Sequence, residues 1–530
     1  MTIPKVPLLS EEERTPVVTT LLEIIHLQGE MIQQLRDEIA ILKGQKPKPQ
    51  IKPSQLEKGP KDSEGENENG ADGKRPGSEK RQKTKELIIH REEKIKPEYV
   101  PDGSTFKGYQ EYVVQDIIIQ PYNTKYLLER WQTPEGDYII GKLPSEVCGT
   151  HFGPTLTSFI LYQYYHGYVT QPLIQEELEE FGVDISTGQV NRIITEGKEE
   201  FHTEKEEILQ VGLEVSRYIN VDDTGARHQG RNGYCTYIGN ELFAWFESTE
   251  SKSRINFLKL LRAGHCDYVL NAEALSYMAA NKLPKEPLAK LTALGEVRFE
   301  NEKEWKEKLE ALRITTDRHI CIATEGALLG SVLEHGFDPQ MAIISDDAGQ
   351  FNLFLHALCW VHTDRIIAKL VGYSDSQREA LEETRSEVWT LYEDLKEYKK
   401  SPSGEKKSQL EARFDEIFTA QTCFISLNQT LKRIHEKKAE LLLVLDRPEI
   451  PLHNNLSEND IREYAKRRKV SGSTRSSDGR RCRDTYTSLK KTCRKLYISF
   501  WVLVNDRVRG KKAIPRLPDL IRLKAQELNS

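Results

Sequence analysis

A chain of 530 residues has room for two to four domains, and its 30% charged against 38% apolar residues indicate a globular protein with additional solvated or disordered segments. The formal net charge of −6 excludes a uniformly basic nucleic-acid-binding protein, although it is compatible with local basic patches. The eight cysteines are scattered without a C-x-x-C pair, which is typical of reduced thiols in a cytoplasmic protein. We expect neither a signal peptide nor a membrane span, because the N-terminus lacks an apolar core and no run of about 18 apolar residues occurs.

The N-terminal region divides into a helical and a polar part. Apolar residues at heptad spacing between residues 17 and 44 predict a short coiled coil, through which the chain is expected to form a homo-oligomer. An amphipathic helix packed on its own chain is the alternative. Residues 45–84 have almost no large apolar side chains, and this composition predicts a disordered linker.

The sequence pattern changes from β-like to helical between residues 96 and 196. Runs such as YQEYVVQDIIIQ, residues 109–120, predict a small antiparallel sheet within residues 96–146. Residues 171–196 are then expected to form two helices, separated by a turn at Gly182 and with Ser186 capping the second. This is helix-turn-helix spacing, although many two-helix corners touch no DNA.

Acidic residues follow two predicted strands of an α/β region that begins at Tyr218. RYINVDDTGAR is expected to form a strand ending at Asp222 and Asp223, followed by the strands GYCTYIGN and LFAWFES. A mostly helical stretch, 265–338, leads to the strand MAIISDDAGQF, which ends at Asp346 and Asp347. LHALCWVHTDRIIAKL is predicted as a helix, and residues 374–442 are charged and helical.

A third acid, Glu458, is expected at the start of a helix after Asn454 and Asn455. Ligands bind open α/β sheets at the carboxyl ends of the strands, and carboxylate oxygens suit Mg²⁺ or Mn²⁺ rather than zinc. A catalytic two-metal site is therefore one interpretation. Turn formation or helix capping by each acidic pair is the other, and an ordinary surface pair of Glu458 with Arg462 is the alternative at the helix.

Four motifs resemble signatures of insertion sequence 66-type transposases: DDTGAR, SDDAGQF, CWVH and NNLSENDIR. The downstream segment RRKVSGSTRSSDG resembles the basic segment of the same family, and the resemblance covers roughly residues 145–510. It implies an RNase H-like fold with a helical insertion, and a catalytic triad of Asp222, Asp346 and Glu458 that holds two Mg²⁺ ions. Mn²⁺ is expected to substitute. The supporting residues implied by position are Asp223, Asp347, Asn454, Asn455, Arg462, Cys359 and His362.

Two features depart from that family. A zinc-binding module often stands before its helix-turn-helix, but residues 96–146 contain no cysteine, so zinc is not expected there. The stretch 265–338 is also longer than the resemblance implies. Cys359 and His362 supply only two zinc ligands, and we expect them to pack beside the active site.

The segment after Glu458 is the most basic part of the chain. Residues 462–495 hold 13 Lys or Arg against three acids, which suits contacts to DNA phosphates, although a solvated charge run is the alternative. The predicted DNA-binding residues are Lys466, Arg467, Arg468, Lys469, Arg475, Arg480, Arg481 and Arg483.

The predicted organisation is an α/β core preceded by smaller modules. Its parts are a coiled coil (1–44), a disordered linker (45–95), a β-rich module (96–146), a helix-turn-helix region (147–212), the RNase H-like core in two parts (213–373 and 443–510), the helical insertion (374–442) and a tail (511–530).

The leading hypothesis is a DNA transposase acting on element ends and target DNA in the bacterial cytoplasm, associated with the nucleoid and aided by possible accessory proteins. Water would cut the element end, and the freed 3′-hydroxyl would then attack target DNA. A catalytically inactive transposase-derived DNA-binding protein and a coiled-coil scaffold are the alternatives. The intact acidic triad disfavours the first, and the basic segment disfavours the second.

Overall fold

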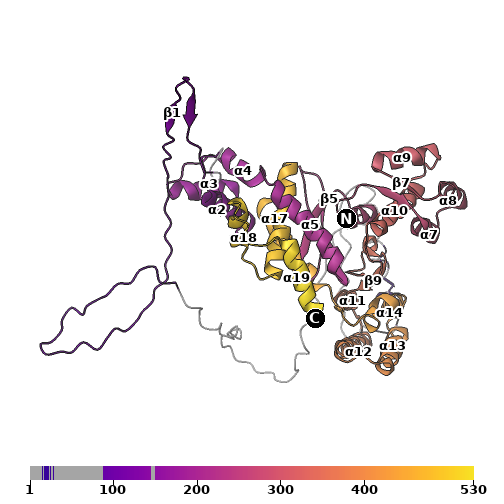
Figure 1. Cartoon of the computed structure of the whole chain (residues 1–530). Coiled ribbons are helices and arrows are strands. Elements are labelled where there is room, and N and C mark those ends of the chain that lie inside the picture. The colour runs from indigo at the N-terminus through magenta and orange to yellow at the C-terminus, as the bar shows by residue number, and fades with distance from the viewer. Residues whose placement is uncertain are drawn as a thin grey trace. The chain divides into compact units, whose positions relative to one another are not determined.

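The computed structural model describes residues 88–144 and 150–529, together with a few residues between Thr15 and Met31. The predicted coiled coil (17–44) therefore lies mostly outside the described residues, as does the predicted linker as far as residue 87. The chain forms two compact units, one of residues 58–122 and one of the remaining residues (Figure 1). None of the described helices has the length and apolar character needed to cross a bilayer.

The β-rich module is much smaller than the sequence pattern predicts. Its described strands are β1 (Arg130–Gln132) and β2 (Tyr138–Ile140), an antiparallel pair around a turn at Gly136. The predicted strand at 109–120 is wrong, because that stretch is extended but unpaired. The apolar side chains of this stretch, such as that of Ile118, are exposed. A β-like sequence pattern was therefore not sufficient for pairing with another strand.

A five-stranded mixed sheet forms the centre of the larger unit. Its order is β5-β4-β3-β8-β9, with β3, β4 and β5 antiparallel and β3, β8 and β9 parallel. The strands are β3 (Tyr218–Gly225), β4 (Tyr234–Gly239), β5 (Ala244–Thr249), β8 (Ala342–Ser345) and β9 (Leu355–Leu358). After β3 the chain adds β4 and β5 on one side of β3, and later β8 and β9 on the other side. The strand order therefore switches between β3 and β8. Ligands bind α/β sheets at such a point.

Two expectations about these strands need correction. Residues 355–358 form β9, the edge strand beside β8, and not the start of a helix, because a short apolar run in a buried strand has the same pattern as a buried helix. Asp222 and Asp223 lie within β3 rather than after it, paired in register with Tyr237 and Thr236 of β4.

Helices pack against the sheet, with α16 on β3 and β4 and α17 on β5. The helix-turn-helix stretch forms two helices that bury Ile174 and Val190, among others. The helices in chain order are α2 (Pro154–Tyr165), α3 (Gln171–Glu180), α4 (Thr187–Thr195), α5 (Glu199–Val215), α6 (Arg254–Leu261), α7 (Ala272–Ala280), α8 (Lys285–Thr292), α9 (Glu302–Ala311), α10 (Asp317–Glu334), α11 (Trp360–Ala368), α12 (Asp375–Lys400), α13 (Gly404–Thr419), α14 (Ile425–His435), α15 (Lys438–Leu441), α16 (Asn455–Ser471), α17 (Ser477–Lys495), α18 (Phe500–Val508) and α19 (Leu517–Asn529). Two short strands, β6 (Tyr268–Leu270) and β7 (Val297–Phe299), pair within the stretch 265–338.

Helix α17 protects the open edge of the sheet. The backbone N–H groups of Ala244, Phe246 and Ser248 in β5 donate to side chains of Thr492, Ser488 and Asp484, at 3.1, 2.9 and 2.8 Å. The spacings match, because four helical residues rise about 6 Å and two strand residues rise about 6.6 Å. The unpaired edge of β5 is thereby covered, which prevents pairing with another chain.

A buried ion pair connects three of the helices that lie side by side near α17 (Figure 1). Arg507 of α18 donates to both carboxylate oxygens of Glu204 in α5, at 3.0 and 2.9 Å, and Glu204 also accepts the N–H of Leu517 in α19. Both charged side chains are almost fully buried. Arg507 also pairs with the equally buried Asp506, so removing Glu204 would leave the buried arginine with one carboxylate partner in place of two.

We expect Glu204→Ala to lower the free energy of unfolding by about 3 kcal/mol, because Arg507 would keep only Asp506 as a carboxylate partner and Leu517 would lose its acceptor. The matched control is Glu207→Ala, one turn along α5, whose pair with Arg516 is partly exposed and is worth about 0–1 kcal/mol. Denaturant unfolding of both variants measures the difference. Equal effects of the two substitutions would contradict the structural role given to the buried pair.

Candidate functional site

Two carboxylates meet where the strand order switches. Asp222 lies on β3 and Asp346 directly follows β8, and the parallel register of Ile219 with Ile343 brings these strand ends together. Burial raises the pKa of Asp222 to about 8, and the negative charge of Asp346 adds to the effect. The backbone N–H of Asp223 donates to Asp222 at 2.7 Å, but this bond does not offset the burial. The pair is therefore an under-neutralised anionic site.

The second aspartate of each pair is tied to the protein. Asp223 accepts hydrogen bonds from Thr236 at 2.5 Å and from Gln350 at 2.9 Å, while burial raises the pKa of Asp223. Asp347 adopts a left-handed backbone with φ of 80°, which is strained for a residue with a side chain, and its carboxylate pairs with Lys437. These partners hold the strand ends and leave Asp222 and Asp346 as the less compensated carboxylates.

Asn454 attaches the start of α16 to the sheet beside Asp222. Its side chain is fully buried; it donates to the carbonyl of Val221 at 2.9 Å and accepts from Asn220 at 2.8 Å. The backbone N–H of Asn454 donates to Cys359 Sγ at 3.1 Å. Cys359 thus packs at the site, and its thiol receives this bond in the interior. Asn455 makes a weaker contact, its own N–H pointing to His453 Nδ1 at 3.4 Å.

Glu458 lies in the first turn of α16, and two arginines donate hydrogen bonds to its carboxylate. Arg365 of α11 donates to both of its carboxylate oxygens, at 2.8 and 3.2 Å, and Arg462 donates from one turn further along at 3.2 Å. Burial acts to raise the pKa of Glu458, but the hydrogen bonds from Arg365 outweigh it, so that pKa lies below its usual value. Glu458 is therefore ionised at neutral pH.

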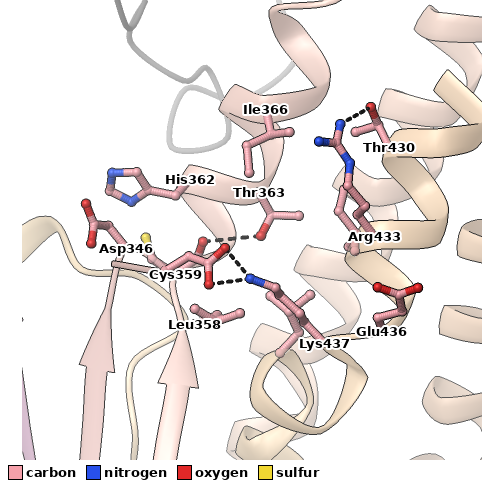
Figure 2. A pocket seen from close by; sticks show the side chains of 13 residues that line it. Asp346, Leu358, Cys359, His362, Thr363, Ile366, Thr430, Arg433, Glu436 and Lys437 are labelled. Carbon is pink, nitrogen blue, oxygen red and sulfur yellow. Dashed lines mark hydrogen bonds and ion pairs between the residues drawn. The ribbon is translucent and has the colours of Figure 1, made fainter. Parts of the chain in front are cut away.

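His362 lies between Glu458 and Asp346. Its Nε2 is 3.7 Å from Glu458 Oε1, and Figure 2 shows its ring beside the carboxylate of Asp346. Burial lowers the pKa of His362, although both carboxylates act in the opposite direction. His362 consequently connects the Asp222–Asp346 pair to Glu458 within one polar cluster. The contacts of Glu458 itself are with Arg365, Arg462 and His362, and we find no bond between it and either aspartate among the described residues.

A cavity of about 400 Å³ opens beside Asp346. One wall comes from β9 and α11, with Leu358 and Ile366, and the other comes from α14 and the residues after it, with Arg433 and Lys437 (Figure 2). The predicted helical insertion, 374–442, therefore contributes two cations to this cavity: Lys437, which pairs with Asp347, and Arg433, which donates to Thr430 (Figure 2).

The carboxylate set fits divalent cations. Oxygen ligands suit Mg²⁺ and Mn²⁺, and a bound cation would offset both the desolvation and the charge of Asp346 that raise the pKa of Asp222. Glu458 would add a third carboxylate, on the condition that its side chain exchanges its arginine partners for the ion. The residues present thus match the ligands expected for a magnesium site.

The predicted DNA-binding residues divide into two groups. Lys466, Lys469, Arg475 and Arg481 are exposed, and Arg468 and Arg480 are half-buried. The prediction for Arg467 and Arg483 is corrected, because both are buried and bonded to the protein. Arg467 donates to the carbonyl of Tyr164 and stacks on its ring, and Arg483 donates to Ser471 at 3.0 Å.

Three residues of the site were missed in the sequence: Arg365, Gln350 and Lys437. Arg365 carries a usable signal, since it follows His362 by three residues and so lies on the same face of α11. Gln350 and Lys437 carry none, because their contacts depend on loop geometry and on the placement of the insertion.

Comparisons with known proteins agree with this geometry. Residues 336–481 match the transposase IS66 family, a range that includes Asp346, His362 and Glu458 but not Asp222. A protein of Sinorhizobium fredii (strain NBRC 101917 / NGR234), printed as the uncharacterized protein y4jO, is 41% identical over 321 residues. The match covers 60% of this chain and 100% of that relative.

Stability should depend on pH through Asp222. Because its pKa is raised to about 8 in the folded protein, its contribution is fully present below the unfolded pKa near 4 and is lost as pH rises through about 8. In EDTA, Asp222→Asn should remove this loss and gain on the order of a few kcal/mol over the wild-type protein at pH 8 relative to pH 5. Denaturant unfolding at the two pH values measures it. The exposed Asp184→Asn is the control, and identical pH profiles for Asp222→Asn and wild type would refute the argument.

Asn454 and Asn455 form a matched pair for testing how α16 is held. Asn454→Ala leaves the buried groups of Asn220 and Val221 without partners, which costs about 1–3 kcal/mol. Asn455→Ala should change stability by less than about 0.5 kcal/mol. Unfolding measurements on both variants decide the matter. A larger effect at Asn455 than at Asn454 would show that the helix is positioned in another way.

Proposed function

The chain belongs to the transposase IS66 family, and from that premise we propose that it is a DNA transposase with an RNase H-like core. It would cut the ends of an insertion sequence and join them to target DNA. The observation that carries the proposal is the half-buried pair of Asp222 and Asp346, in which desolvation and then the charge of Asp346 raise the pKa of Asp222 to about 8. A bound divalent cation would neutralise this pair.

The sheet supports the RNase H-like assignment. Three antiparallel strands continue through β3 into two parallel strands, and the acidic residues stand at the switch between β3 and β8. The helices α12 to α15 interrupt the chain between this sheet and Glu458, as a helical insertion would.

We assign Asp222, Asp346 and Glu458 as ligands of two Mg²⁺ ions, with Mn²⁺ as a substitute. Two such ions, when bound, make water or a 3′-hydroxyl a better nucleophile and stabilise the leaving oxygen in phosphoryl transfer. Asn454 holds the start of α16 so that Glu458 faces the sheet. Arg365 keeps Glu458 ionised and aligned before substrate arrives. No covalent bond between protein and DNA is required, because each step transfers a phosphoryl group between oxygens.

The proposed DNA surface begins beside this site. Lys466 and Lys469 of α16, Arg475 of the following loop and Arg481 of α17 are exposed and could contact phosphates from solvent, although Arg481 would first leave its exposed pair with Glu199. Helices α3 and α4 are a second candidate for duplex contact, and residues 17–44 are proposed to bring two copies of the chain together. We also propose accessory transposition proteins as further partners of the chain.

We expect Glu458→Gln to abolish Mg²⁺-dependent nicking of duplexes carrying the element ends while DNA binding is retained. The substitution keeps the size of the side chain but removes the charge that holds a divalent ion. Binding depends on the basic surface, so the salt dependence of affinity should keep its slope, roughly −0.9 per neutralised phosphate. Nicking gels and binding titrations at several salt concentrations measure the two effects.

The control for this experiment is Glu405→Gln, at the exposed start of α13, which should change neither property. Nicking at the wild-type rate by Glu458→Gln would remove this residue from the catalytic set. Wild-type protein that binds DNA but never nicks it would favour a transposase-derived DNA-binding protein.

A further inference from the structure

A second cluster of metal-ligating side chains lies outside the carboxylate site. His265, Asp267 and His335 place one potential ligand atom each within 4.8 Å of the others. His335 Nε2 is 2.9 Å from Asp267 Oδ1, and the rings of His265 and His335 stack with their centroids 3.5 Å apart. None of these residues contributes to the proposed transposition chemistry.

The three residues stand at the two ends of one segment of the chain. His265 and Asp267 directly precede β6 (Tyr268–Leu270), and His335 directly follows α10 (Asp317–Glu334). All three belong to the stretch 265–338, which is longer than the family resemblance implies. The cluster therefore joins the beginning of this segment to its end, shortly before β8 begins at Ala342.

The ligand chemistry favours zinc over magnesium. Two imidazole nitrogens and one carboxylate oxygen are a ligand set used for Zn²⁺, with water in the fourth position. Zinc–ligand bonds of about 2.0–2.1 Å place neighbouring ligands roughly 3.3 Å apart in a tetrahedron. The separations of 2.9 and 3.0 Å between His335 Nε2 and the two carboxylate oxygens of Asp267 are close to that value. The ring of His265 stacks parallel to that of His335, and because His265 is exposed it would turn out of this stack to point its lone pair at the ion.

The surroundings orient the cluster for an ion. Asp267 is buried, and Ser331 donates to its Oδ1 at 3.0 Å, which fixes the carboxylate as outer-shell partners do in metal sites. The guanidinium of Arg298 lies 3.5 Å from Asp267 Oδ2 and would repel a bound cation. It is half-exposed, however, and also pairs with Glu334.

We propose that His265, Asp267 and His335 bind one Zn²⁺ ion, which fastens the two ends of the segment 265–338 together. The ion is structural, and it is separate from the magnesium site and from the cysteine-free module at 96–146. By closing this segment it would fix the point from which the chain enters β8, the strand that carries Asp346 at its end.

The test uses the full-length protein stripped with EDTA and then dialysed against submicromolar free Zn²⁺ in millimolar Mg²⁺. Zinc per chain is measured by plasma mass spectrometry. His265→Gln and His335→Gln should each bind one zinc fewer than wild type, whereas His319→Gln, a histidine within the same segment, should bind as many as wild type. Because His265 is exposed, its replacement leaves the packing intact.

A second measurement locates the ion. Zinc should slow hydrogen exchange at β6 and at the last turn of α10 in wild type and in His319→Gln, but not in His265→Gln. Equal zinc content in wild type and both cluster variants would overturn the proposal. Zinc-dependent protection that persists in His265→Gln would overturn it as well.

Discussion

Two carboxylates held side by side in a protein interior repel each other, and the arrangement around Asp222 and Asp346 follows from that constraint. Parallel pairing of β3 with β8 brings the aspartates together, and burial raises the pKa of Asp222 to about 8. Neighbouring acids are treated differently: Asp223 receives two side-chain hydrogen bonds and Asp347 pairs with Lys437. The protein therefore satisfies the supporting acids and leaves Asp222 and Asp346 as the less compensated pair, as the proposed metal site requires.

The same constraint explains why the third carboxylate is held by arginine. A buried, ionised Glu458 beside two further acids would be unstable alone, and Arg365 supplies two hydrogen bonds to it. Arg365 thus stands where a divalent ion would otherwise balance the charge. The basic segment has a comparable double role, since Arg467 and Arg483 stabilise the interior while Lys466, Lys469 and their exposed neighbours face solvent.

Much of the fold could be predicted from the sequence, and the failures have physical causes. Strands β3, β4, β5 and β8 have clear apolar patterns, and the asparagine–glutamate motif indicated the helix that carries Glu458. The pattern at 109–120 predicted a strand wrongly because strand formation needs a partner, and β9 was taken for helix because its buried face is continuous. The spacing of Arg365 from His362 could have placed it on the same helix face, but its bond to Glu458 joins distant segments, as does the His265–Asp267–His335 cluster, and no local pattern contains such contacts.

The most direct test of the central claim is anomalous scattering from Mn²⁺ in crystals of the protein bound to element-end DNA. The account predicts manganese peaks within about 2.2 Å of carboxylate oxygens of both Asp222 and Asp346, with Glu458 turned from Arg365 toward one of the ions. Peaks confined to other carboxylates, or a fully occupied complex in which Asp222 and Asp346 share no ion, would contradict it.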